Sequence, residues 1–207
     1  ARTVVVATQP HVAADLLDHV DPDAAAAAAR IDAPPLAVVF TGYRRRQIAH
    51  PLTGLGYLAP ERERRTLLGA LFCSTMFSGR ASAGYVALAA YIGGARAPDL
   101  ARASPADLVD ATRREFRELL GATGSPVVSR VRQWARGLPQ YRVGHQGRIE
   151  ALLAVEERCP GLFLTGNYFS GPSVAACIAQ AVETTNRIDR YLSRLERQCG
   201  MAARIRA

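Results

Sequence analysis

The chain opens on an unbroken apolar run, Thr3–Ala7, in which apolar and polar residues do not alternate. A strand of this kind is typical of a parallel α/β sheet, where both faces of each strand are covered. A strand that needs neighbours on both sides is unusual as the first element of a complete protein. Because the sequence also lacks an initiator methionine, we expect it to be the C-terminal fragment of a longer chain.

The next part of the chain predicts a different kind of sheet. Short β-like segments follow one another there, separated by turns rich in Gly, Pro and Arg. These connections are too short for the crossovers that parallel strands require, so we predict an antiparallel sheet. Its expected strands are Leu36–Phe40, Tyr57–Leu58, Thr66–Phe72 and Gly84–Tyr91. Further along the chain, Val127–Trp134 alternates apolar and charged residues and is expected to be a half-exposed strand.

One helix carries clear signals at both ends. Ser104 is a suitable N-cap, Pro105 fits the first helical position, and Gly121 ends the apolar periodicity. Weaker signals predict three further helices: one that begins at Pro10, a connecting helix over Ala24–Ala29, and one from Gln146 to Arg158.

Near the C-terminus an apolar strand, Gly161–Thr165, leads through the loop Gly166–Pro172 into a helix from Ser173 to about Gln198. The start of a helix presents unpaired backbone N–H groups and the positive end of its dipole. The arrangement favours an anionic ligand or an electron-rich ring edge. A plain strand–loop–helix connection with Ser173 as N-cap is the alternative.

Charge excludes some mechanisms. All 26 basic residues are arginine, so a Schiff-base lysine, a P-loop lysine and a lysine general base are excluded. The net charge of +8 favours an anionic partner, although a biased genomic composition explains the arginine content equally well. The hydrophobic fraction of 49% and charged fraction of 21% are those of a globular protein.

No metal site or catalytic nucleophile is predicted. The 4 cysteines (Cys73, Cys159, Cys177 and Cys199) lack CxxC spacing, so free thiols are expected, and neither HExxH nor a G-x-S-x-G elbow occurs.

The segment Gly54–Ala59 formally fits the dinucleotide-binding motif G-x-G-x-x-A. It follows Pro51 rather than a strand, and Pro60 stands where the phosphate-binding helix should begin, so we interpret it as a turn.

A series of segments has a family likeness. Leu-Pro-Gln-Tyr-x-Val-Gly-His at 138–145, followed by Gly-Asn-Tyr at 166–168, is its most specific part. With 58–60, 75–81 and 91–95, it resembles the C-terminal half of the oxygen-dependent protoporphyrinogen and coproporphyrinogen oxidases, in the flavin amine-oxidase-like superfamily.

The resemblance implies a mixed α+β and α/β fold, part of a two-domain FAD-linked oxidoreductase. Residues 1–20 and 133–207 would be returning segments of the FAD domain, and 21–132 a portion of the substrate-binding domain with its antiparallel sheet. The family's glycine fingerprint for the FAD pyrophosphate lies near its N-terminus and has no counterpart in this sequence. This chain alone is therefore expected to bind FAD poorly.

The resemblance also implies site residues, none of them catalytic. Positions expected at the flavin are Trp134, Gly166, Asn167, Gly171, Pro172, Ser173 and Val174. Positions expected to line the porphyrinogen pocket are Leu58, Leu71 and Tyr91. For Leu58 and Leu71, ordinary core packing is an equally good explanation.

The implied reaction is FAD-dependent oxidation of a porphyrinogen to the porphyrin with O2 as acceptor, in haem biosynthesis. Protoporphyrinogen IX and coproporphyrinogen III both remain open as substrates, as does the oligomeric state. The expected location is the cytoplasm, with or without peripheral contact with the inner face of the membrane. The alternatives are another oxidoreductase of the superfamily and a basic nucleic-acid-binding module; dispersed charge and an aromatic content of 7% argue against the latter.

Overall fold

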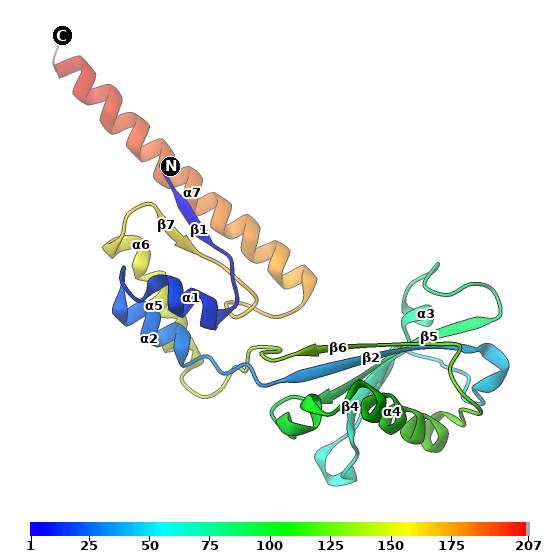
Figure 1. Cartoon of the computed structure of the whole chain (residues 1–207). Helices are drawn as coiled ribbons and strands as arrows, with labels where there is room; N and C mark the ends of the chain where they lie inside the picture. The colour runs from blue at the N-terminus through cyan, green and yellow to red at the C-terminus, as the bar shows by residue number, and fades with distance from the viewer. Residues whose placement is uncertain (206–207) are drawn as a thin grey trace. The chain divides into compact units, whose positions relative to one another are not determined.

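The computed structural model describes residues 1–205, with side chains as far as residue 198. The chain forms two compact units: unit 1 is Ala1–Asp32 with Pro139–Ala207, and unit 2 is Ala33–Leu138 (Figure 1). The boundaries follow residues 32 and 138, whereas we expected domain boundaries after residues 20 and 132. Cys73, Cys159 and Cys177 are free, and the side chain of Cys199 lies outside the described residues.

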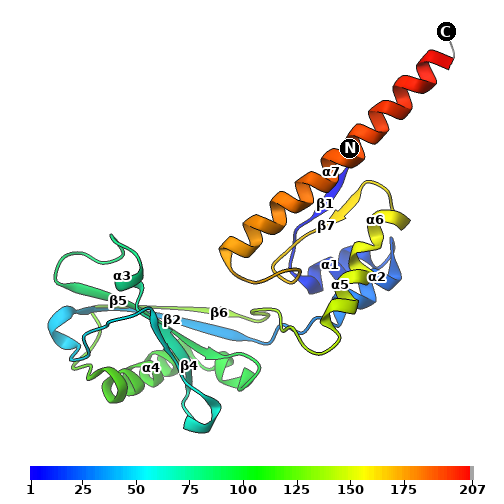
Figure 2. The same ribbon diagram turned by 180° about the vertical axis from the view of Figure 1, so that it is seen from behind.

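Unit 1 is built on a parallel strand pair. β1 (Val4–Val6) pairs with β7 (Leu162–Leu164), as the opening apolar run predicts. The long helix α7 (Val174–Ile205) runs alongside this pair in both views (Figures 1 and 2). Arg187 on α7 holds it there: Nε donates to Glu156 Oε1 at 2.9 Å and Nη2 donates to the Leu164 carbonyl at 3.2 Å.

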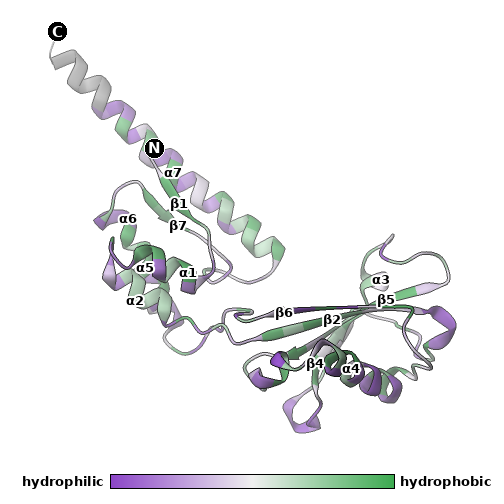
Figure 3. Cartoon of the chain, in the orientation of Figure 1, coloured by the Kyte–Doolittle hydropathy of each residue, from purple (hydrophilic) through white to green (hydrophobic). Residues whose placement is uncertain are grey.

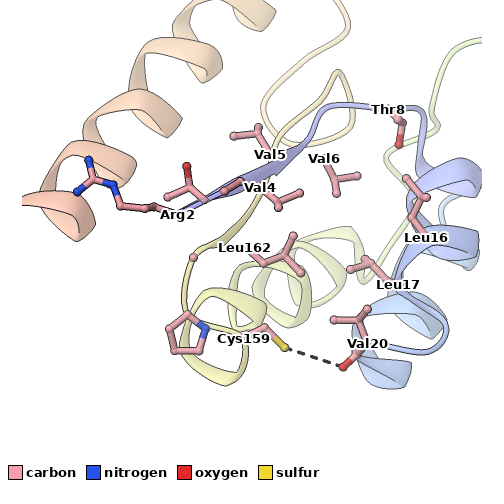
Figure 4. Close-up of a pocket in the computed structure, with 14 residues that line it drawn as sticks. Arg2, Val4, Val5, Val6, Thr8, Leu16, Leu17, Val20, Cys159 and Leu162 are labelled. Carbon is pink, nitrogen blue, oxygen red and sulfur yellow. Dashed lines mark hydrogen bonds between the residues drawn. The ribbon is translucent and has the colours of Figure 1, made fainter. Parts of the chain in front are cut away.

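The expectation that the first strand is covered on both faces was wrong for this chain. Val4 is 54% exposed and Val5 44%, and β7 is the one strand that pairs with β1 within residues 1–205. An apolar hollow of about 640 Å³ therefore lies beside β1. Figure 4 shows it between β1 and the end of the first helix, with Leu17 and Leu162 on its wall.

Four short helices complete unit 1: α1 (Pro10–Leu17), α2 (Pro22–Ala29), α5 (His145–Leu153) and α6 (Val155–Arg158). The last two replace the single helix expected from Gln146 to Arg158, because the chain turns at Ala154. α2 packs against both α1 and α5, which is why unit 1 extends to Asp32. The Ala24–Ala29 run is thus part of the core, where it was expected to be a connecting helix.

Asp21 fixes the start of α2 and is only 5% exposed. Its Oδ1 accepts a hydrogen bond from the Ala24 N–H at 3.0 Å, and its Oδ2 accepts one from Arg158 Nε at 2.6 Å. The hydrogen bond from the Arg158 guanidinium lowers the pKa of the Asp21 carboxyl. The side chain therefore joins the chain's two distant stretches within unit 1.

Unit 2 contains the predicted antiparallel sheet, with strand order β3-β4-β5-β2-β6. β2 and β5 are longer than expected because they pair along their whole length, from Leu36↔Gly93 to Arg44↔Tyr85. The motif Gly54–Ala59 was interpreted as a turn, but it contains an edge strand of this sheet, which covers the strand expected at Tyr57–Leu58. The strands are β2 (Leu36–Arg44), β3 (Gly56–Leu58), β4 (Leu67–Leu71), β5 (Tyr85–Gly93) and β6 (Val128–Trp134).

The helix α4 (Pro105–Leu120) covers one face of this sheet (Figure 2). Its ends are as predicted: Ser104 Oγ accepts from the Asp107 N–H at 3.2 Å, and Gly121 takes a left-handed conformation with φ of +60°. The buried Glu115 accepts the N–H groups of Thr66 at 2.5 Å and Leu67 at 3.2 Å. This carboxylate anchors the start of β4 beneath the helix.

The remaining short helices lie in the connections of unit 2: η1 (Arg45–Gln47), η2 (Glu61–Glu63), α3 (Cys73–Met76) and η3 (Pro98–Arg102). Figure 3 shows η1 as hydrophilic beside the hydrophobic strand β2. Arg45 within it donates to the carbonyls of Ile48 at 2.6 Å and His50 at 2.9 Å. One arginine of the Arg44–Arg46 cluster is thus used to hold the turn.

Candidate functional site

In unit 1 a cavity lies at the carboxyl ends of the two parallel strands. Thr8 follows β1, and Gly166 and Asn167 follow β7. Ligands in parallel sheets bind outside these strand ends. The cavity holds about 370 Å³ and is lined by Ala7, Thr8, Gln9, Thr165, Gly166, Asn167, Cys177 and Ala181.

Gly166 allows the two strand ends to approach each other closely. Its φ is +156°, and a Cβ there would lie 2.6 Å from Tyr168 Cε1 and 3.3 Å from the Thr8 carbonyl oxygen. A side chain at this position would push the loop away from β1. Gly166 therefore shapes this wall of the cavity, and its contact with a flavin stays a prediction.

The segment Pro139–His145 holds the loop after β7 in place. The Tyr141 hydroxyl donates to the Asn167 carbonyl at 2.5 Å, and His145 Nε2 lies 2.7 Å from the Tyr168 carbonyl. Since a carbonyl can only accept, His145 must carry its proton on Nε2. The rings of Tyr141 and His145 pack with centroids 4.5 Å apart. The sequence analysis gave His145 no structural role, although it ends the motif at 138–145.

The first turn of α7 borders the same loop. Ser173 Oγ accepts from the Ala176 N–H at 3.1 Å, so Ser173 is the N-cap. Pro172, Ser173 and Val174 are exposed, and the N–H groups at the helix start have no intrahelical acceptor. Gly171 takes a φ of +153° immediately before them. The structure thus brings together, in one loop and helix start, the flavin positions predicted after β7.

One polar group in the cavity wall was missed by the sequence analysis. Thr8 Oγ1 is buried and has no hydrogen-bond partner among the described residues. A buried hydroxyl without a partner favours a polar ligand that could satisfy it. Its position directly after the first strand is the signal that could have identified it. The carbonyl and N–H edge of a flavin ring offers such a partner, so the residues present fit this cofactor.

The other predicted residues lie in unit 2, on one face of the sheet. In an antiparallel sheet, directly paired residues point to the same side. Leu58 pairs with Gly69 and Gly69 with Tyr91, while Leu71 pairs with Ala89. The opposite face of the sheet packs on α4, and the buried residues of that opposite face include Val39 and Leu88. We call the face that carries the paired residues the open face; Leu58, Leu71, Tyr91 and Trp134 all belong to it.

Exposure separates these four positions from ordinary core residues. Leu58 is 86% exposed, so core packing is wrong as an explanation for it. Leu71 and Tyr91 are half-buried, and burial raises the pKa of the Tyr91 phenol. Trp134 is 42% exposed, and the Arg132 guanidinium carbon lies 4.7 Å from its ring centroid. The open face is an apolar surface available for contact with a ligand.

Among the residues that the structure describes, no three His, Cys, Asp or Glu side chains gather as a metal site would require. No helix there has both the length and the apolar character needed to cross a bilayer.

Comparison with known proteins identifies relatives of this chain. Residues 1–188 match the flavin-containing amine oxidoreductase family. The chloroplastic protoporphyrinogen oxidase of Oryza sativa subsp. japonica is 33% identical over 204 residues, which are 94% of this chain and 38% of that protein. The coproporphyrinogen III oxidase of Bacillus subtilis (strain 168) is 25% identical, over 91% of this chain and 40% of that protein.

A solved structure shares the fold. A protein from Exiguobacterium sp. 255-15, assigned as a protoporphyrinogen oxidase, superposes with a TM-score of 0.74 at 21% identity, over 92% of this chain and 41% of that one. The chain thus spans well under half of the rice and Bacillus relatives, 38% and 40% of their lengths. The resemblance stated from the motif at 138–145 and the Gly-Asn-Tyr loop is confirmed.

Proposed function

The chain belongs to the flavin-containing amine oxidoreductases, and from this we propose that it is part of an FAD-dependent porphyrinogen oxidase. The observation that carries the proposal is the pairing of two features. One is a cavity at the carboxyl ends of β1 and β7 with an unpaired buried hydroxyl, Thr8 Oγ1. The other, in unit 2, is an apolar face of the antiparallel sheet on which Leu58 is exposed.

In this proposal unit 1 supplies part of the FAD domain and unit 2 part of the substrate domain. Gly166 and Asn167 form the wall against the flavin, and Gly171 and Pro172 lead the loop away from it. Ser173 and Val174 direct backbone N–H groups toward the ring edge. For Trp134 the flavin contact stays a prediction.

Leu58, Leu71 and Tyr91 would contact the porphyrinogen ring and keep water from it. An aromatic and two leucines suit a broad, largely apolar macrocycle. FAD, when bound, would accept a hydride (two electrons and one proton) at a time while the substrate releases a second proton, and the two electrons with two protons would pass to O2 as H2O2. Three such rounds convert a porphyrinogen and three O2 into the porphyrin and three H2O2, and the protein's part is orientation and electrostatics.

The finer assignments belong to the same proposal. The substrate is protoporphyrinogen IX or coproporphyrinogen III. The similar proteins support both, since they include a protoporphyrinogen oxidase and a coproporphyrinogen III oxidase. The reaction belongs to haem biosynthesis and takes place in the cytoplasm, where the net charge of +8 also suits contact with an anionic membrane surface.

The test uses the full-length flavoprotein that contains this chain. Given either porphyrinogen and air, it should produce porphyrin fluorescence with three H2O2 per porphyrin, and neither product without O2. Turnover of an amine without porphyrin formation would support another oxidoreductase of the superfamily instead. Binding to DNA or RNA that weakens steeply with salt, in a protein free of flavin, would support the nucleic-acid alternative.

A further inference from the structure

We propose that Arg130 and Arg132 on β6 bind two propionate carboxylates of the substrate while its ring lies on the open face. This inference rests on the proposed function, since porphyrinogens carry such acid groups on an apolar macrocycle. It assigns a role in substrate recognition to two arginines that the sequence analysis left without one.

The strand register orders the open face into two cross-strand rows. The first row consists of Leu58, Gly69, Tyr91, Val38 and Arg132. The second row consists of Gly56, Leu71, Ala89, Phe40 and Arg130. Each row is apolar from β3 to β2 and ends in an arginine on β6, and Figure 3 shows hydrophilic stretches of β6 beside the hydrophobic β2.

The spacing of these rows suits a macrocycle with acid groups on one side. Adjacent strands lie about 4.8 Å apart, so the backbone of Arg132 is roughly 10 Å from that of Tyr91, two strands away. Arg130 and Arg132 are two residues apart on one strand, which separates their backbones by about 6.6 Å. A ring placed over β4 and β5 would thus direct two neighbouring carboxylates toward two neighbouring guanidinium groups.

Both arginines are free to bind an anion. Neither forms an ion pair with a carboxylate in the described part of the chain. Arg130 Nη1 donates only to the Ser129 carbonyl at 2.9 Å, and Arg132 stacks on the Trp134 ring. Stacking leaves the N–H groups in the guanidinium plane available as donors.

The other side of unit 2 is different. There, Arg65 pairs with Glu118 at 2.6 Å and Arg113 with Asp110 at 3.1 Å, so these positive charges are balanced within the protein. The two rows of the open face contain no acidic residue. Their unbalanced positive charge beside an apolar surface matches a largely apolar macrocycle that carries carboxylates, because planar guanidinium groups bind carboxylates through paired N–H donors.

The experiment compares a porphyrinogen diacid with its dimethyl ester in the full-length flavoprotein. The variants are Arg130→Gln, Arg132→Gln, the double variant and Arg132→Lys. Arg114→Gln, at an exposed position on α4, is the matched control. Each glutamine variant should raise KM for the diacid about tenfold with little change in kcat, because hydrogen bonds between charged groups are lost. Arg132→Lys should recover part of that loss.

The ester distinguishes recognition from structure. With both carboxylates methylated, wild type and double variant should have equal KM values. Product binding gives a second measurement: the diacid porphyrin should bind the double variant about a hundredfold more weakly, by fluorescence titration, if the two effects add. The inference would be overturned if the double variant raised KM equally for the diacid and the ester. It would also be overturned if the glutamine variants had the same KM for the diacid as Arg114→Gln. If the wild type oxidises neither porphyrinogen, it is the proposed function that fails.

Discussion

The Tyr141 hydroxyl donates to the backbone carbonyl of Asn167 at 2.5 Å, so the loop before α5 is tied to the loop after β7. Tyr141→Phe removes this bond and keeps the ring that packs on His145. We expect a loss of about 1 kcal/mol in the free energy of unfolding, and less flavin retained by the purified full-length protein. Tyr85→Phe, at a 41% exposed position of unit 2, is the control and should change neither. Thermal unfolding and flavin absorbance measure the two effects.

Gly166 is expected to be intolerant of any side chain. In Gly166→Ala the new Cβ would lie 2.6 Å from Tyr168 Cε1 in a backbone conformation that favours glycine. Crowding and backbone strain together should cost about 2–4 kcal/mol. Gly147→Ala is the matched control: it lies within α5 with no atom near its added Cβ, and it should stabilise the protein slightly. A Gly166→Ala variant as stable as wild type would contradict this account of the loop.

The Asp21–Arg158 pair predicts a pH dependence. The native pKa of Asp21 is lowered, so its contribution to stability is present above the unfolded-state pKa, about 3.9, and is lost as the pH falls through the native value. Asp21→Asn keeps an N-cap side chain and should cost about 1–3 kcal/mol near pH 7. The difference from wild type should shrink below about pH 4. Denaturant unfolding across pH measures this.

A second ion pair serves as the control for that measurement. Asp110→Asn breaks the exposed pair with Arg113, in which the aspartate side chain is 58% exposed. Such pairs contribute at most about 1 kcal/mol. If Asp21→Asn and Asp110→Asn lost the same free energy of unfolding at neutral pH, burial would not increase the contribution of the Asp21 ion pair to stability.

Leu58 should matter for substrate and not for stability. Because it is 86% exposed, Leu58→Ser should change the free energy of unfolding by less than about 0.5 kcal/mol. Loss of apolar contact with the macrocycle should raise KM roughly tenfold. Leu55→Ser, at a 66% exposed position outside the two rows, should leave KM unchanged. A stability loss above 2 kcal/mol in Leu58→Ser would restore core packing as its role.

Local signals in the sequence predicted local structure well. Ser104, Pro105 and Gly121 set the ends of α4 through contacts within one or two turns, so no distant information was needed. Likewise the glycine loop and Ser173 predicted the strand–loop–helix unit around the cavity. The antiparallel character of the middle sheet followed from its short connections.

Non-local contacts explain what the sequence did not predict. The continuous Val4–Val6 run predicts cover on both faces, but the described residues provide only part of that cover. The strand order, with β2 between β5 and β6, is set by pairing between distant segments. Without it, the shared face of Leu58, Tyr91 and Arg132 was not predictable. The hydrogen bonds of His145 and the unpaired Thr8 hydroxyl depend on the same tertiary contacts.

The division of unit 1 into two stretches of chain has a consequence for biosynthesis. Val4 pairs with Leu162, so β1 leaves the ribosome without its partner and waits until all of unit 2 has been translated. At about 5–20 residues per second this delay is roughly ten seconds or more. Unit 2 is one continuous stretch of chain that contains all of its strands, so it can fold during this delay.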